Sequence, residues 1–514
     1  MSSIIRYTLV ALGAVLVLLL AATLAVLLLV NPEDYREEIV AALSEESGRP
    51  VSLEGELDLG VLPCCSLQLG RLAAGPPADG DAGDEIAVEG VNIRVQLWPL
   101  VARRELLVEQ VAVERVSLDT IELLEVNFSG IGIAPGQTGD VRLELLANGI
   151  VPDQSLPLKL QGKVFLDGET NQAELRDLDI ELDQSTITGW LRLSDPQLSA
   201  VEFELAVDRL DADRYLGDTE EESSAADTGS VNDTRIDIPV QALRDARLNG
   251  SLAIGELVFS GAQLKELDIT VAAADGTLRL HPLTARLYGG SYAGDVRLDV
   301  RGTKPKLSVN EQLENITLAA LLSDTRGAAN LSGSGNVGIK ASASGDTVGE
   351  LLERLSGDAS FALSDGIYKG VDLWHEIRRA RALIKKAAVP EKPADPQTEV
   401  SEFSGTLQFA GGQVSNPDFR AAIPFMRLTG NGSFNLLSEA VDYTLQARVI
   451  DTPTFGEGEE LDKLEGLTLP VRITGTASEP KVKVDLGELA KDAAKDAVKD
   501  KVRERLRKKF RLFD

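Results

Sequence analysis

The sequence is poor in the residues that most often carry chemistry. Its 514 residues include two histidines, two cysteines, two methionines and three tryptophans, and aromatic residues make up 4% of the chain. So few histidines and cysteines exclude a zinc-finger array and a scaffold held by many disulfides. The chain also lacks the glycine period of collagen. Hydrophobic residues form 43% of the sequence, which is too many for a globally disordered protein.

Positive charge is in short supply. The 52 Lys and Arg residues are opposed by 81 Asp and Glu residues, so the formal net charge is 52 − 81 = −29. A nucleic-acid-binding protein needs a basic surface to offset phosphate repulsion. We therefore expect no nucleic-acid partner.

The one long uninterrupted apolar run is at the start of the chain. Residues 8–30 are 23 consecutive uncharged positions, mostly Leu, Val and Ala. A helix of this length spans about 35 Å, enough to cross a bilayer core of roughly 30 Å. A cleavable signal peptide normally has only about 7–15 apolar residues before small residues at its cleavage site. We predict an uncleaved transmembrane anchor within residues 1–30.

The flanking charges predict the orientation of this anchor. Arg6 precedes the run, whereas Glu33, Asp34, Glu37 and Glu38 follow it. The positive-inside rule then places the N-terminus in the cytoplasm and the bulk of the chain outside. In a bacterium the outside is the periplasm.

The body of the chain is dominated by alternation of apolar and polar residues. A period of two is typical of strands with one wet face, and Gly, Asn and Asp clusters between the runs are typical of hairpin turns. Related strand–glycine–strand segments recur at residues 185–193, 290–300, 427–436 and 472–486. Such repetition favours one elongated β-array over several unrelated globules.

Few segments predict helices. We expect them over residues 34–47, 347–356 and 371–388. Residues 217–233 carry six acidic and no basic side chains with little apolar content, which predicts a disordered linker. The expected divisions are 1–30 (cytoplasmic tip and anchor), 31–215 (first β region), 216–236 (acidic linker), 237–485 (second β region) and 486–514 (a basic amphipathic helix).

A long sheet with one apolar face must bury that face against something. The predicted helices are too few to cover so many strands. Either the sheet closes on itself as sandwiches or barrels, or it curls into a groove whose apolar lining meets a ligand. Lipid acyl chains would suit such a groove because they need no polar partner. The pattern alone leaves both possibilities open.

No constellation of residues predicts catalysis. His281 and His375 lie far apart and in no metal-ligand spacing, and His281 is expected at a strand end beside Pro282. Residues 289–293 lack the second glycine of a nucleophile elbow, and residues 333–340 are interpreted as a glycine-rich turn entering a strand. Adjacent Cys64 and Cys65 are expected to be structural, because neighbouring cysteines rarely bond to each other. We expect no enzymatic activity, no cofactor and no metal.

The C-terminal tail has the opposite charge to the rest. Between residues 491 and 511 there are ten basic and four acidic residues, a net charge of 10 − 4 = +6. A basic amphipathic helix is a candidate for an anionic membrane surface or an acidic partner, although it could also dock on the body or stay solvated. The candidate membrane-surface residues are Lys501, Arg503, Arg505, Arg507, Lys508 and Lys509.

Several segments together resemble the AsmA family of bacterial envelope proteins. They are NPEDYREEIVAALSEESGRPVSLEGELDLGVLP (31–63), VNIRVQLWPLVARRELLVEQVAVERVSLD (91–119), LDADRYL (210–216), the block at 243–294, DGIYKGVDLW (365–374), LTGNGSFNLLSEAVDYTLQARV (428–449) and ITGTASEPKVKVDL (473–486). These segments together extend over nearly the whole chain. The Cys64–Cys65 pair, the acidic 217–233 segment and the long basic tail depart from the family pattern.

The resemblance implies a single-pass protein of the bacterial inner membrane with a large periplasmic β-rich body. It also implies membership of the bridge-like lipid-transfer superfamily, whose fold is an elongated, twisted antiparallel β-groove with a short chorein-like helical start. The family is linked to phospholipid traffic, to assembly of outer-membrane proteins and to lipopolysaccharide levels. The resemblance therefore favours the groove over the sandwich.

Two functions remain open. One is handling or transfer of phospholipid through the groove in support of outer-membrane biogenesis. The other is a non-enzymatic assembly factor or scaffold that acts on outer-membrane proteins. The candidate lining residues for lipid are Leu178, Ile180, Leu182, Val201, Phe203, Leu205, Val296, Leu298, Val300, Tyr443, Leu445 and Val449.

Overall fold

The computed structural model describes most of the chain between residues 36 and 484. Within that range it leaves out residues 48, 56, 61–65, 76–85, 96–107, 119–120, 132–135, 152–153, 168–169, 171, 196–199, 217–233, 237, 328, 371, 373–374, 376–377, 380–381, 383–387, 452–465, 467 and 477–478. The predicted anchor, the Cys64–Cys65 pair, the acidic segment 217–233 and the basic tail therefore lie outside the described residues. Within the described part, no helix is both long and apolar enough to cross a membrane.

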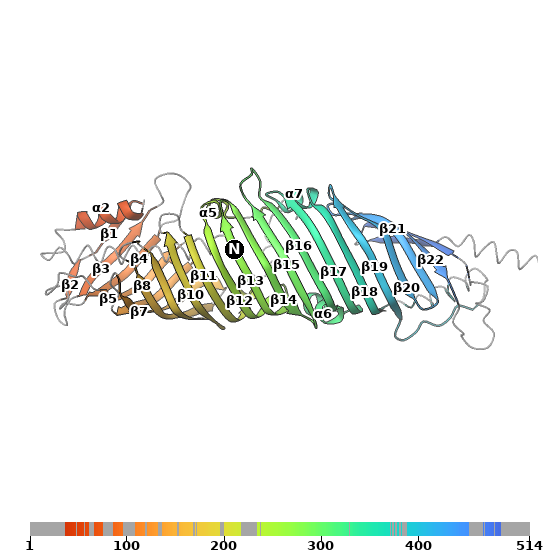
Figure 1. Cartoon of the computed structure of the whole chain (residues 1–514), viewed down its shortest axis with the longest axis horizontal. Helices are drawn as coiled ribbons and strands as arrows, with labels where there is room; N and C mark the ends of the chain where they lie inside the picture. Colours follow the sequence, from red (N-terminus) through yellow and green to blue (C-terminus); the bar gives the residue numbers. More distant parts are fainter. Residues whose placement is uncertain are drawn as a thin grey trace, which may run out of the picture.

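The described strands form a single sheet of 24 strands (Figure 1). Strands β1 (Val51–Glu54) and β2 (Asp58–Gly60) both pair with β3 (Ser66–Ala74), and from β3 onward each strand pairs with the next one in the sequence. At about 4.8 Å per strand the sheet is roughly 100 Å long. The prediction of a mainly β chain with one long, open antiparallel sheet is confirmed.

The remaining strands have the bounds that follow. They are β4 (Ile86–Val95), β5 (Val108–Leu118), β6 (Ile121–Ile131), β7 (Thr138–Val151), β8 (Gln154–Leu166), β9 (Ala173–Leu182), β10 (Ser185–Asp195), β11 (Ala200–Asp211), β12 (Arg247–Phe259), β13 (Ala262–Ala274), β14 (Thr277–Leu287), β15 (Gly290–Asp299), β16 (Lys306–Thr317), β17 (Leu331–Ser344), β18 (Ser356–Lys369), β19 (Gln397–Ala410), β20 (Gln413–Ile423), β21 (Met426–Asn435), β22 (Ala440–Val449), β23 (Thr468–Thr476) and β24 (Pro480–Val484).

One pair of strands breaks the antiparallel order. Strands β11 and β12 are parallel, with Ala200 opposite Arg247 and Asp211 opposite Val258. Parallel neighbours need a crossover, because the chain must return to the edge at which the first strand began. The predicted linker 216–236 falls within this crossover, and the sheet continues across it through direct pairing of β11 with β12.

Both ends of the crossover are fixed to the sheet edges. After β11, Asp213 in helix α4 (Asp213–Leu216) accepts hydrogen bonds from the backbone N–H groups of Ser260 and Gly261, at 2.5 and 2.8 Å. On the far side, the N–H of Ile236 donates to the carbonyl of Asp346 at 2.9 Å. Helix α5 (Val240–Asp245) then leads into β12. The crossover thus starts at one long edge of the sheet and ends at the other.

The other helices are short and few. Helix α2 (Arg36–Ser47) packs Leu43 into the apolar cluster of β1–β6, α6 (Leu318–Arg326) follows β16, and α7 (Val348–Glu353) precedes β18. In Figure 1, α5 and α7 lie along one long edge of the sheet and α6 lies along the opposite edge. Outside the N-terminal end, these helices leave the sheet as a single layer.

The structure corrects several local expectations. The predicted helix 347–356 ends at Glu353, because β18 already begins at Ser356. Residues 333–340 are not a turn but part of β17, since each of their neighbours in β16 and β18 continues the ladder. His281 lies inside β14 at a register shift rather than at a strand end. Of the predicted helix 371–388, the described residues 375, 378, 379 and 382 are helical, whereas Asp372 and Ala388 are not.

Gly189 marks a place where the sheet tolerates no side chain. It sits in β10 at a register shift against β9, with φ +141°, and a Cβ atom there would lie 2.0 Å from the backbone carbonyl oxygen of Glu204. Gly335 in β17 is different, because a Cβ atom would meet nothing closer than 3.5 Å. Of the two, only Gly189 must be a glycine, because the backbone of β11 at Glu204 comes too close for a side chain.

We expect Gly189→Ala to lower the free energy of unfolding by about 2–4 kcal/mol, because the backbone of β10 or β11 must shift. Gly335→Ala is the matched control and should change it by less than about 1 kcal/mol. Urea unfolding followed by circular dichroism measures both. Equal losses in the two variants would contradict the steric explanation.

Candidate functional site

One face of the sheet is apolar along its whole length. The register carries apolar side chains from each strand directly onto the next: one row runs through Leu143, Leu160, Ile180, Ile187, Val207, Ile254 and Leu267. The row crosses the parallel β11–β12 pair without changing face. Further along, the rows Leu278–Leu298–Leu307–Ala343 and Leu428–Ala447–Leu469 continue the same surface. We call this surface the apolar face.

The apolar face is covered at its N-terminal end and half-exposed beyond it. Under α2 the side chains are buried, with Val91 and Val116 at 1% exposure and Ile93 at 0%. From β8 onward most side chains on this face are only half-buried, as in the alternating pattern of β8 and β22. The difference arises because no helix or second sheet of the described part lies over the middle of the face.

Aromatic side chains form a row across the C-terminal half of this face. Phe361 and Phe403 have ring centroids 5.3 Å apart, Phe403 and Phe419 are 5.1 Å apart, and Phe419 and Tyr443 are 6.2 Å apart. Offset and edge-to-face contacts of this kind stabilise aromatic pairs beyond the burial of their area. The three phenylalanines are not among the predicted lining residues, although each stands at an apolar position of an alternating run.

Glu311 is a charged residue on the apolar face. It lies in β16 opposite Gly294 and Ile339, and the hydroxyl of Tyr292 donates a hydrogen bond to its Oε2. Burial, followed by the hydrogen bond and charge of Glu311, raises the pKa of Tyr292, so the phenol stays a donor. Oε1 of Glu311 is buried and has no hydrogen-bond partner. The pair interrupts an otherwise apolar row.

Asn416 is a second polar residue on this face, and its hydrogen bonds are satisfied. Its Nδ2 donates to the carbonyl of Thr406 at 2.6 Å, and its Oδ1 accepts from the hydroxyl of Tyr443. Asn416 is 6% exposed, and burial of an amide is favourable only when both of its ends are paired. Tyr443 therefore has a structural partner as well as a place in the aromatic row.

The opposite face of the sheet is charged. Arg192 on β10 bridges Glu174 on β9 and Glu202 on β11 at 3.2 and 3.4 Å, and Arg279 on β14 pairs with Asp295 on β15 at 2.7 Å. Exposed ion pairs of this kind contribute little to stability. Their consistent placement shows which face is turned to water.

The structure places the predicted lining residues as follows. Eleven of them lie on β9, β11, β15 and β22 at positions of the apolar face, and Val300 directly follows β15. Leu178, Val300 and Val449 are buried at 3%, 1% and 0% exposure, so other parts of the protein already cover them. The other nine are half-buried. The predicted membrane-surface residues 501–509 lie outside the described residues.

The histidines do not come together. His281 is half-exposed on the charged face, with Nδ1 3.8 Å from Asp295, whereas His375 is buried at 4% exposure. Among the described residues, no group of three His, Cys, Asp or Glu side chains could hold a metal ion. The distinctive surface of the described part is therefore the apolar face.

The sequence matches the AsmA family over residues 1–129 and 151–419. It is also similar to Protein AsmA of Escherichia coli (strain K12), with 21% identity over an alignment of 586 residues that covers 93% of each chain. No solved structure is significantly similar to it. The family match spans most of the sequence, including the helical start and all strands from β8 to β19, and it confirms the resemblance seen in the sequence. The chain belongs to the AsmA family.

Proposed function

We propose that this protein holds phospholipid on its apolar face and passes it along the sheet, as an inner-membrane-anchored envelope protein that supports outer-membrane biogenesis. The observation that carries the proposal is the apolar face that continues from β11 into β12, where Val201, Phe203, Leu205, Leu248 and Leu252 are half-buried. A folded protein rarely exposes so large a contiguous apolar surface without a partner for it.

Acyl chains fit this surface chemically. Burial of their apolar surface is favourable by about 25 cal/mol per Å², and they need no hydrogen-bond partner. The binding free energy of an acyl chain is therefore similar at successive positions on the face. A lipid can therefore move along the rows without a chemical step, and the proposal includes no catalysis and no cofactor. The headgroup stays at the edge or open side, in contact with water.

The length of the sheet supports transfer over storage. At roughly 100 Å the apolar face is several times longer than one phospholipid. The closed end under α2 and the open remainder give the face a direction along the chain. Membership of the AsmA family, a family of bacterial envelope proteins, supports a lipid path in the envelope, where lipid must cross water.

Phospholipid should co-purify with the full chain, and Val296→Asp with Leu298→Asp should reduce it at least about fivefold. Both side chains are half-buried on the apolar face, and a carboxylate there must be desolvated by an acyl chain. Native mass spectrometry with lipid extraction measures the ratio. Ser308→Asp with Asn310→Asp, on the charged face of the neighbouring strand, is the matched control and should retain the lipid.

A wild-type chain that purifies folded and free of lipid would contradict the proposal. That result would favour the alternative of an assembly factor that acts through protein binding.

Lipid should contact the face at both ends of the open region. A photo-crosslinking residue placed at Leu160 in β8 or at Leu445 in β22 should capture phospholipid in intact membranes, since both positions are half-buried on the apolar face. The neighbouring positions Lys159 and Thr444 point to the charged face and should not. Capture at one end only would contradict movement along the whole sheet.

A further inference from the structure

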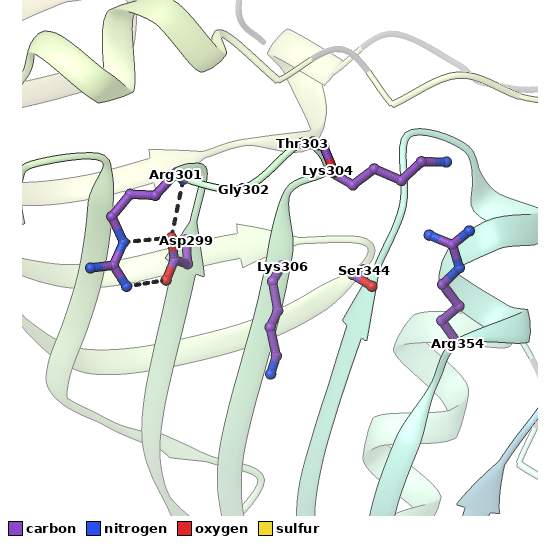
Figure 2. A pocket seen from close by; sticks show the side chains of 8 residues that line it. All are labelled: Asp299, Arg301, Gly302, Thr303, Lys304, Lys306, Ser344 and Arg354. Atoms are coloured by element: carbon purple, nitrogen blue, oxygen red, sulfur yellow. Dashed lines mark hydrogen bonds and ion pairs between the residues drawn. The ribbon is translucent and has the colours of Figure 1, made fainter.

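A basic pocket lies at the long edge of the sheet that carries α5 and α7. It has a volume of about 810 Å³ and is lined by Asp299, Arg301, Gly302, Thr303, Lys304, Lys306, Ser344 and Arg354 (Figure 2). The loop between β15 and β16 forms one side, and the ends of β17 and α7 form the other. Four cationic side chains in one pocket stand out in a chain with a net charge of −29.

The loop that forms the pocket is held in place by its neighbours. Arg244 of α5 donates from Nε to the carbonyl of Val300 at 3.0 Å and from Nη2 to the carbonyl of Gly302 at 3.3 Å. The N–H of Gly345 donates to the carbonyl of Pro305 at 3.2 Å, which joins the two sides. The pocket is therefore a fixed part of the edge.

Two of the four cations are already neutralised. Arg301 donates to both carboxylate oxygens of Asp299, and these bonds together with the backbone N–H of Arg301 lower the pKa of Asp299 to about 2. Lys304 forms an ion pair with Glu350, and its ammonium lies 3.6 Å from Asp346. The Lys304 bond is the largest cause of the lowered pKa of Glu350, and the charge of Arg354 adds to it.

Lys306 and Arg354 are the cations left over. Neither side chain forms a hydrogen bond or a direct ion pair with any residue in the described part, and Lys306 faces an Asp299 whose oxygens are taken by Arg301. Counting Asp346 and Glu350 with the lining, the pocket carries four positive and three negative charges, a net of 4 − 3 = +1. The hydroxyl of Ser344 lies beside them as a further donor (Figure 2).

The same edge exposes an apolar side chain on the other face. Leu307 follows Lys306 in β16, so the two side chains point to opposite faces, and Leu307 is 37% exposed in the row Leu298–Leu307–Ala343. Adjacent residues of a strand are about 3.3 Å apart. Because Lys306 and Leu307 are the first two residues of β16, an amphiphile whose tail lies on this row can pass its charged group around the end of the strand to Lys306 on the charged face.

We propose that the basic pocket binds the phosphate group of a phospholipid whose acyl chains lie on the apolar face at Leu298 and Leu307. Lys306, Arg354 and Ser344 supply the donors, because a phosphate accepts charge-assisted hydrogen bonds from ammonium and guanidinium groups. The inference rests on the proposed function and adds a headgroup site to it.

Isothermal titration of the full chain in a phosphate-free detergent tests the site. The probes are dihexanoylphosphatidylglycerol, dihexanoylglycerol and inorganic phosphate. Lys306→Gln with Arg354→Gln should weaken binding of the short-chain phospholipid about tenfold and leave dihexanoylglycerol unchanged, since the loss of charge-assisted bonds affects only the phosphate. Arg326→Gln with Lys369→Gln removes the same charges at the opposite edge and should change neither.

Unchanged phospholipid affinity in the Lys306/Arg354 variant, or equal weakening in the control, would overturn the site. Inorganic phosphate that binds as tightly as the phospholipid, with no effect of Val296→Asp and Leu298→Asp, would identify a free-phosphate site and overturn the lipid source.

Failure of the proposed function has a different signature. Dihexanoylglycerol would then not bind the wild type, and the two aspartates on the apolar face would leave phospholipid affinity unchanged. That outcome would overturn both the lipid path and the headgroup site. If instead the wild type binds dihexanoylglycerol but the Lys306/Arg354 variant binds the phospholipid as tightly as the wild type does, only the headgroup site is overturned.

Discussion

The structure depends on one constraint: a single-layer sheet has an apolar face and no second layer to bury it. Backbone pairing of 24 strands satisfies the hydrogen bonds but does nothing for the alternate side chains. Helix α2 solves the problem at one end, where Ile93 is fully buried. Beyond β8 the side chains shield one another only in part, and a ligand that supplies apolar surface would complete the burial.

Continuity of that face makes strict demands on register. A slip of one residue turns every side chain of a strand to the other face, so each new pairing must preserve the alternation. The parallel pair is the critical place, because the chain leaves the sheet after β11 and returns 36 residues later. Val207 nevertheless meets Ile254, and Ile254 meets Leu267, so the row survives the crossover. Asp213 helps to fix the start of this connection by holding the turn between β12 and β13.

Period-two alternation is a local signal, and for that reason the sequence predicts the strands and the face on which Phe203 or Leu445 lies. Features that depend on partners far along the chain are invisible to it. The alternation predicts only that Tyr443 is on the apolar face. It cannot predict that the Tyr443 hydroxyl donates a hydrogen bond to Asn416, 27 residues away. The glycines at 333–338 predict a turn, but pairing with β16 and β18 on either side makes them part of strand β17. Helix α6 was not predicted, because nine residues are too few to establish a helical period in the sequence.

Charge placement decides how an acidic protein can accept an anionic amphiphile. On the charged face, basic residues such as Arg192 and Arg279 are matched by carboxylates on neighbouring strands, which makes them less available to a phosphate. On the apolar face, the carboxylate of Glu311 would repel a phosphate. At the edge, by contrast, the unmatched Lys306 of the charged face is next in sequence to the exposed Leu307 of the apolar row, so a headgroup can be held there. A phospholipid held there would keep its acyl chains on the apolar face while its phosphate lies at the edge.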